Sequence, residues 1–126
     1  MYVADTHAWV YYLLNRLPNT SNNIFASVEN GNDVIFVPTI ALSECIHLIG
    51  KKKIILTYEG LFSRFDESNN FIVAPLNLDI TKHVSEINLK ELHDRIIVAT
   101  AEFLNATLIT KDKEIIKSGI VKTIWQ

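Results

Sequence analysis

Cysteine, glycine and proline are scarce in this chain, and the shortages exclude several kinds of structure. The 126 residues include one cysteine, Cys45, so no disulfide can form within the chain. The four glycines never cluster, which argues against a glycine-rich loop that would cradle a phosphate group. Apolar runs are short as well, and none approaches the roughly 18 residues that a membrane-spanning helix needs.

Motifs for zinc binding and for nucleophilic catalysis are missing too. The four histidines are scattered, and no cysteine or histidine pair has the close spacing of a zinc site. No serine or cysteine lies in a nucleophile elbow or has the partners of a catalytic triad. A phosphorelay receiver domain has this length, but its third strand would end at a phosphoacceptor aspartate, where this chain has Ala74-Pro75-Leu76.

The bulk composition is that of one ordinary globular domain. With 48% apolar and 21% charged residues, residues 1–126 are enough for a single hydrophobic core. The net charge of −2 neither indicates nor excludes a nucleic-acid partner. Because the chain does not open with a basic segment followed by an apolar run, we expect no signal peptide and a soluble, cytoplasmic protein.

Short apolar runs alternate with amphipathic segments along the whole chain, which predicts an α/β domain. Strands are expected at 2–4, 33–37, 71–74, 107–110 and 121–125. Helices are expected at about 8–15, 21–29, 39–49, 53–65, 79–89, 94–104 and 112–117. Such alternation is typical of a mostly parallel sheet with helices on both faces.

Acidic residues lie where the ends of parallel strands would meet. Asp5 follows the first strand, and Asp112 follows the fourth. Asp94 opens the helix before that fourth strand, and Glu44 lies in the helix after the second. Taken alone, each acid is better explained as a helix cap or a surface residue. If the first and fourth strands are neighbours, however, the acids converge in one crevice at the carboxyl edge of the sheet.

A cluster of carboxylates favours a particular chemistry. Close carboxylates repel one another and raise one another's pKa values unless cations neutralise them. Sites made only of oxygen suit hard ions such as Mg²⁺ or Mn²⁺. Two such ions can position a water molecule for in-line attack on a phosphodiester. The crevice therefore predicts a metal-dependent phosphodiesterase.

Four segments carry a family resemblance. They are V-A-D-T-H-A-W at the start, P-T-I-A-L-S-E-C-I in the middle, then H-D-R-I-I-V-A-T-A and L-I-T-K-D. In this order and spacing the chain resembles the PIN-domain nucleases, in particular the VapC-like toxins of toxin–antitoxin pairs. The resemblance covers the whole chain and implies a five-stranded parallel sheet in the order 3-2-1-4-5. It places the family's metal-binding, catalytic acids at Asp5, Glu44, Asp94 and Asp112, with Thr110 as a supporting hydroxyl.

The resemblance also implies a function. It predicts an endoribonuclease that hydrolyses RNA with Mg²⁺ or Mn²⁺ and is controlled by a small antitoxin protein. Together with the apolar helices expected after the first and second strands, it implies a homodimer. The alternative is a catalytically inactive PIN-fold domain that binds RNA or protein. Acids at all four positions argue against that alternative, because a binding scaffold has no need of clustered charge.

Overall fold

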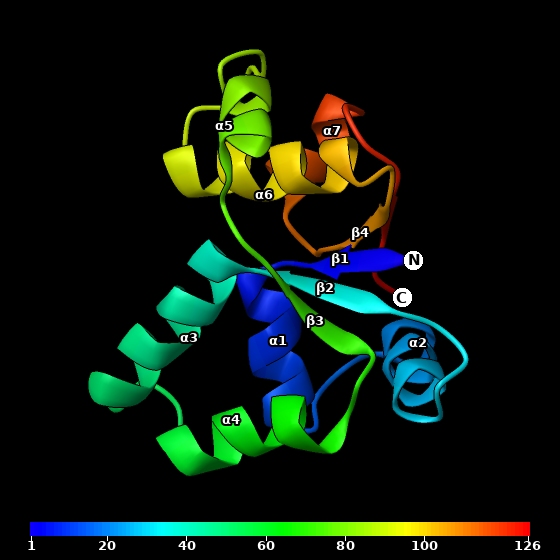
Figure 1. Cartoon of the computed structure of the whole chain (residues 1–126), viewed down its shortest axis with the longest axis vertical. Coiled ribbons are helices and arrows are strands. Elements are labelled where there is room, and N and C mark those ends of the chain that lie inside the picture. The colour runs from blue at the N-terminus through cyan, green and yellow to red at the C-terminus, as the bar shows by residue number, and fades with distance from the viewer.

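A single five-stranded sheet runs through the centre of the molecule, in the order β3-β2-β1-β4-β5 (Figure 1). The computed structural model describes all residues, 1–126. The strands are β1 (Tyr2–Ala4), β2 (Ile35–Pro38), β3 (Phe71–Ala74), β4 (Thr107–Ile109) and β5 (Thr123–Ile124). Every neighbouring pair is parallel, and β1 lies between β2 and β4. The predicted α/β class and strand order are confirmed.

Seven helices cover the two faces of this sheet. They are α1 (Thr6–Leu13), α2 (Asn19–Glu29), α3 (Thr39–Gly50), α4 (Tyr58–Glu67), α5 (Leu78–Val84), α6 (Leu92–Phe103) and α7 (Lys113–Ser118). Figure 1 shows α1 to α4 on one side of the strands and α5 to α7 on the other. Both faces of a short parallel sheet are thereby shielded from water, as the hydrophobicity of its strands requires.

Two hydrophobic cores, one on each face, follow from the alternation of side chains along the strands. Along β4, Leu108 faces the core under α5, α6 and α7, whereas Ile109 faces the core under α1 to α4. The core under α1 to α4 is aromatic and centres on Trp9. The centroid of its ring lies 5.3 Å from that of Phe25 and 5.2 Å from that of Phe71. Stacked layers of this kind hold the carboxyl ends of β1 and β4 rigidly side by side.

Local hydrogen bonds change one end of each of two helices from its predicted position. Helix α4 begins at Tyr58 and not at residue 53, because the Thr57 hydroxyl accepts the N–H of Gly60 at 3.0 Å. Helix α5 ends at Val84 and not at residue 89. Its last turn tightens through bonds between residues three apart, such as Ser85 N–H to the carbonyl of Lys82, which ends the helix.

The apolar faces of α1 and α3, expected to support a homodimer, are used inside the domain. Trp9 and Leu13 of α1 and Cys45 of α3 are buried in the aromatic core, whereas Leu42 and Ile46 on the same face of α3 are only partly buried. Apolar side chains are exposed elsewhere, along β3 and the loop after it and near the start of α4; they include Ile55, Phe62, Ile72, Val73, Leu76 and Leu78. None of the helices is both long enough and apolar enough to cross a lipid bilayer.

Candidate functional site

A small pocket of about 140 Å³ lies at the carboxyl edge of the sheet, beside the ends of β1 and β4. All four acids predicted from the sequence line it, and a fifth carboxylate joins them. The pocket contains no lysine or arginine. Its lining residues are Asp5, Thr6, His7, Glu44, Glu91, His93, Asp94, Ile97 and Asp112.

Asp5 is fixed at the end of β1 by two hydrogen bonds. Its Oδ1 accepts the N–H of Ala8 at 2.8 Å and so caps α1, and its Oδ2 accepts the hydroxyl of Thr110. Only 4% of Asp5 is exposed. This burial raises the pKa of Asp5, and the two hydrogen bonds oppose that shift only in part. Asp5 is therefore both a helix cap and a wall of the pocket.

Thr110 joins the two strand ends. Besides donating to Asp5, its Oγ1 accepts the backbone N–H of Asp112 at 3.0 Å. Asp112 Oδ1 in turn accepts the N–H groups of Glu114 and Ile115, at 2.9 and 3.0 Å, and caps α7. Thr110 does not line the pocket itself, but its hydroxyl sets the relative position of two acids that do.

Glu44 is not a free surface glutamate. The hydroxyl of Thr6 donates to its Oε1 at 2.7 Å, and His93 Nδ1 lies 3.5 Å from its Oε2. About a third of its side chain, 32%, remains exposed. Glu44 thus points back from α3 toward the first turns of α1 and α6, which brings it to the pocket.

Asp94 is a second acid of the pocket whose ionisation is strongly disturbed. It is the third residue of α6, inside the first turn, and it does not cap the helix. Burial raises its pKa to about 6, and four neighbouring negative charges push in the same direction; in decreasing order they are Asp112, Asp5, Glu91 and Glu44. A carboxyl group with so many acidic neighbours and no basic partner is typical of functional sites.

Glu91, Thr6 and His93 are pocket residues that the sequence reasoning did not select. Glu91 precedes Asp94 by three positions, the spacing at which two residues share one side of a helix. That spacing could have indicated it. The contacts of Thr6 and His93 with Glu44 depend on how α1, α3 and α6 pack, so no local pattern in the sequence indicates them.

The donor set of the pocket suits a hard divalent cation. Its acids lack any Lys or Arg counter-charge, and oxygen is the atom that Mg²⁺ and Mn²⁺ prefer. No three acidic, histidine or cysteine side chains come close enough to enclose one ion directly. Magnesium usually keeps several of its waters and uses only one or two carboxylates directly. The residues therefore fit a cation held in part through water.

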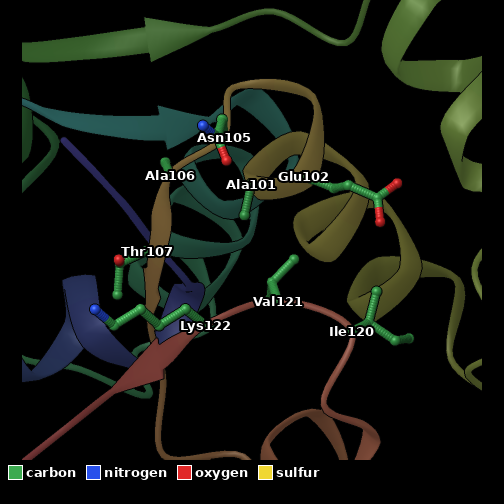
Figure 2. Close-up of a pocket in the computed structure, with 8 residues that line it drawn as sticks. All are labelled: Ala101, Glu102, Asn105, Ala106, Thr107, Ile120, Val121 and Lys122. Carbon is green, nitrogen blue, oxygen red and sulfur yellow. The ribbon is translucent and has the colours of Figure 1, made fainter.

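A second hollow, of about 300 Å³, lies on the opposite edge of the sheet, at the starts of β4 and β5 (Figure 2). Thr107 and Lys122 line it beside Glu102. Glu102 is already paired with His83, whose Nδ1 lies 2.9 Å away. This hollow has no cluster of unpaired acids, so the carboxylate pocket is the better candidate for a metal site.

The sequence of residues 2–119 matches the PIN domain. The chain belongs to the PIN domain family. The match covers almost the whole chain, including the four acids of the pocket. No curated protein matches the chain by sequence search.

Solved structures share this PIN fold over almost their whole length. A chain of VapBC2 from Rickettsia felis, bound to a DNA fragment from its promoter, has a TM-score of 0.74 and 19% identity, covering 99% of this chain and 98% of that one. A toxin–antitoxin complex from Klebsiella pneumoniae has a TM-score of 0.66 and 22% identity, covering 98% of this chain and 96% of that one. FitAcB from Neisseria gonorrhoeae has a TM-score of 0.67 and 17% identity, covering 98% of this chain and 96% of that one. At these identities the likeness concerns the fold.

Proposed function

We propose that this PIN domain is a metal-dependent endoribonuclease and the toxin of a toxin–antitoxin pair. The observation that supports the nuclease is the meeting of Asp5, Glu44, Asp94 and Asp112 in one pocket without a basic counter-charge. A scaffold that only bound RNA would gain nothing from acids that repel a phosphate. The pocket instead suits the cations that a phosphodiester substrate needs.

The residues of the pocket have different roles in this proposal. Asp5 and Asp112, joined through Thr110, hold two carboxylates rigidly at the strand ends, and Thr6 aims the Glu44 carboxylate toward them. Asp94 supplies a carboxylate that ionises near neutral pH. Bound Mg²⁺ or Mn²⁺ would activate water and stabilise the leaving oxygen. Substrate selection favours single-stranded or looped RNA, because a regular duplex holds its backbone away from a narrow pocket.

The test is cleavage of single-stranded RNA with Mg²⁺, with Mn²⁺ and with excess EDTA. We expect internal cuts in the presence of either metal, none in EDTA, and less cleavage at higher salt because phosphate contacts are screened. Asp94→Asn serves as the inactive control, and Asp79→Asn, an exposed acid in the first turn of α5, as the matched active one. Cleavage that survives EDTA, or survives Asp94→Asn, contradicts the metal site. RNA binding without cleavage under all conditions favours the inactive binding module.

Support for the toxin role comes from the toxin–antitoxin complexes among structures of the same fold. We infer a small antitoxin partner and a homodimer, and we place their contacts on the apolar side chains that remain exposed, such as Ile72 and Leu78, since the α1 face is buried. Expression alone should arrest growth, and co-expression with a small neighbouring gene product should relieve it. Unchanged growth in both cases contradicts the toxin role; light scattering of the purified protein tests the dimer.

A further inference from the structure

A lysine and two aromatic residues form a cation–aromatic cluster next to the carboxylate pocket. Lys111 Nζ lies 4.4 Å from the centre of the Tyr11 ring and donates a hydrogen bond of 2.5 Å to the Tyr11 hydroxyl. The ring of Trp125 meets the ring of Tyr11 at a steep angle, with 5.4 Å between centroids. The three residues come from α1 and from the ends of β4 and β5, so the tertiary fold builds the cluster.

Strand geometry places this cluster beside the site. Ile109 faces the core under α1, and Thr110 turns the other way to reach Asp5. Lys111 therefore returns to the α1 side, one residue before Asp112 of the pocket. The N–H of Thr110 donates to the carbonyl of Ile124 at 3.1 Å, which sets the end of β5 level with this segment.

Lys111 keeps its positive charge unpaired although an acid follows it directly. The ion pairs of the chain are Met1–Asp33, His83–Glu102 and His93–Glu44, so Lys111 forms none. An ammonium group has three N–H donors, and the Tyr11 hydroxyl takes one of them. The side chain is exposed, so the remaining donors face solvent. Tyr11 thus fixes the position of the cation, which forms no ion pair with the pocket acids.

The C-terminus is also held by contacts that do not involve Lys111. The Ser21 hydroxyl already donates to the carbonyl of Trp125, and Ile124 packs against the core under α1 to α4. These contacts hold the C-terminus without using the charge of Lys111, which leaves that charge free for a ligand. A ligand that must approach an acidic pocket needs a fixed cation nearby.

We propose that Lys111 binds a backbone phosphate of single-stranded RNA beside the phosphate that enters the carboxylate pocket, and that Tyr11 and Trp125 are positioning residues for it. This inference rests on the proposed nuclease function. A lysine is a point charge that contacts phosphate whatever the base sequence, so the contact fixes the register of the strand and not its sequence. The attraction offsets the repulsion between the RNA backbone and the pocket acids.

The test measures RNA binding separately from cleavage. A fluorescein-labelled single-stranded RNA is titrated in Mg²⁺ over a series of salt concentrations, with every protein also carrying Asp94→Asn so that the RNA stays intact. Lys111→Gln should weaken binding about tenfold at low salt and lower the slope of log K against log salt by about 0.7, the value for one lost contact to a single strand. Lys111→Arg should retain this slope. Tyr11→Phe should weaken RNA binding but leave the slope unchanged.

Lys122→Gln is the matched control, because Lys122 is an exposed lysine on the opposite edge of the sheet (Figure 2). It should bind RNA as the parent does. An unchanged slope for Lys111→Gln overturns the proposal, as does an equal loss for Lys122→Gln. A lower melting temperature for Lys111→Gln with unchanged RNA binding also overturns it and assigns the cluster a structural role.

The enzyme with Asp94 intact separates this inference from the proposed function. In Mn²⁺, Lys111→Gln should raise KM for RNA and leave kcat nearly unchanged, because a remote phosphate contact holds substrate and transition state alike. If the parent enzyme does not cleave RNA but binding still depends on Lys111, the proposed function fails and the phosphate contact stands. If the parent cleaves RNA and Lys111→Gln changes neither KM nor RNA binding, the phosphate contact is wrong and the proposed function stands.

Discussion

The hydroxyl of Thr6 donates a 2.7 Å hydrogen bond to Oε1 of Glu44, across 38 positions of sequence. Thr6 begins α1 and Glu44 lies in the middle of α3, so the bond joins the helices that follow β1 and β2. It leaves Oε2 of Glu44 beside His93 and turned toward the other acids. The orientation of Glu44 therefore depends on Thr6, a neutral residue that follows Asp5 in the sequence.

Replacing Thr6 with valine should impair the site more than the fold. The change removes the donor to Glu44 while keeping the branched shape, and loss of such a supporting contact typically costs 10–100-fold in metal affinity or activity. Glu44 is partly exposed, so water can replace the hydroxyl, and the free energy of unfolding should change by under about 1 kcal/mol. Mn²⁺ titration and cleavage rates test this. Thr81→Val, which removes an exposed hydroxyl from α5, is the control and should leave both unchanged.

Thr110→Val should instead destabilise the domain. The substitution strips the hydroxyl from the buried Asp5 and from the N–H of Asp112, and an unsatisfied buried polar group costs about 1–3 kcal/mol. Thr110→Ser keeps both hydrogen bonds and loses only a methyl group, so it should be clearly more stable than the valine variant. Urea unfolding without metal measures the difference. Equal stabilities would show that the hydroxyl does not hold the strand ends together.

Asp94→Asn should melt higher than the wild type in EDTA. The change removes one of several crowded negative charges, and residues that serve function often stabilise a protein when they are neutralised. Losing an acid in the first turn of α6 opposes the gain by roughly 0.3–1 kcal/mol, so the relief of repulsion must exceed that. In Mn²⁺ the difference in melting temperature should shrink or change sign. The reason is that a ligand at a hundredfold excess over its dissociation constant stabilises the protein that binds it by about 2.7 kcal/mol. A variant that melts lower in EDTA, with an equal metal shift in both proteins, would mark Asp94 as structural only.

The raised pKa of Asp94 predicts two opposite pH dependences. The pKa moves from 3.8 to about 6, so between these values the folded protein binds more protons than the unfolded chain. The metal-free protein should therefore lose stability as pH rises from about 4 to 6, and the loss should be smaller in Asp94→Asn, where only the raised pKa of Asp5 remains. Metal competes with the proton, so Mn²⁺ affinity should rise over the same interval and level off above it. Melting curves and calorimetric titrations at pH 5, 6 and 7 test both signs.

The sheet and the strand-end acids could be predicted because each depends on a simple pattern. Alternation of apolar runs and amphipathic segments indicates α/β, and acids directly after strands share an edge in a parallel sheet. Asp5 and Asp112 therefore meet as soon as β1 and β4 pair. The strand order itself came from the family resemblance, since runs of two to four residues give no indication of their neighbours.

The features that sequence reasoning missed depend on packing between distant elements. The apolar stripe of α1 reads as a possible surface for a partner, but Phe25 and Phe71 from other elements cover Trp9. Which side of α3 turns toward the pocket depends in the same way on how that helix packs. The start of α4, however, depends on a local signal, and its cap Thr57 could have indicated it.

Pairing of β1 with β4 has a consequence for synthesis on the ribosome. β1 emerges first, whereas its partner β4 begins at Thr107, so the central strand keeps one open edge until most of the chain has been made. Asp112 comes later still, and the hydrogen bond between Thr110 and Asp5 closes a loop of 105 positions. A nascent chain thus carries Asp5 for several seconds, at about 5–20 residues per second, before the pocket can exist. An enzyme that cuts RNA would in this way stay inactive until its own translation is nearly complete.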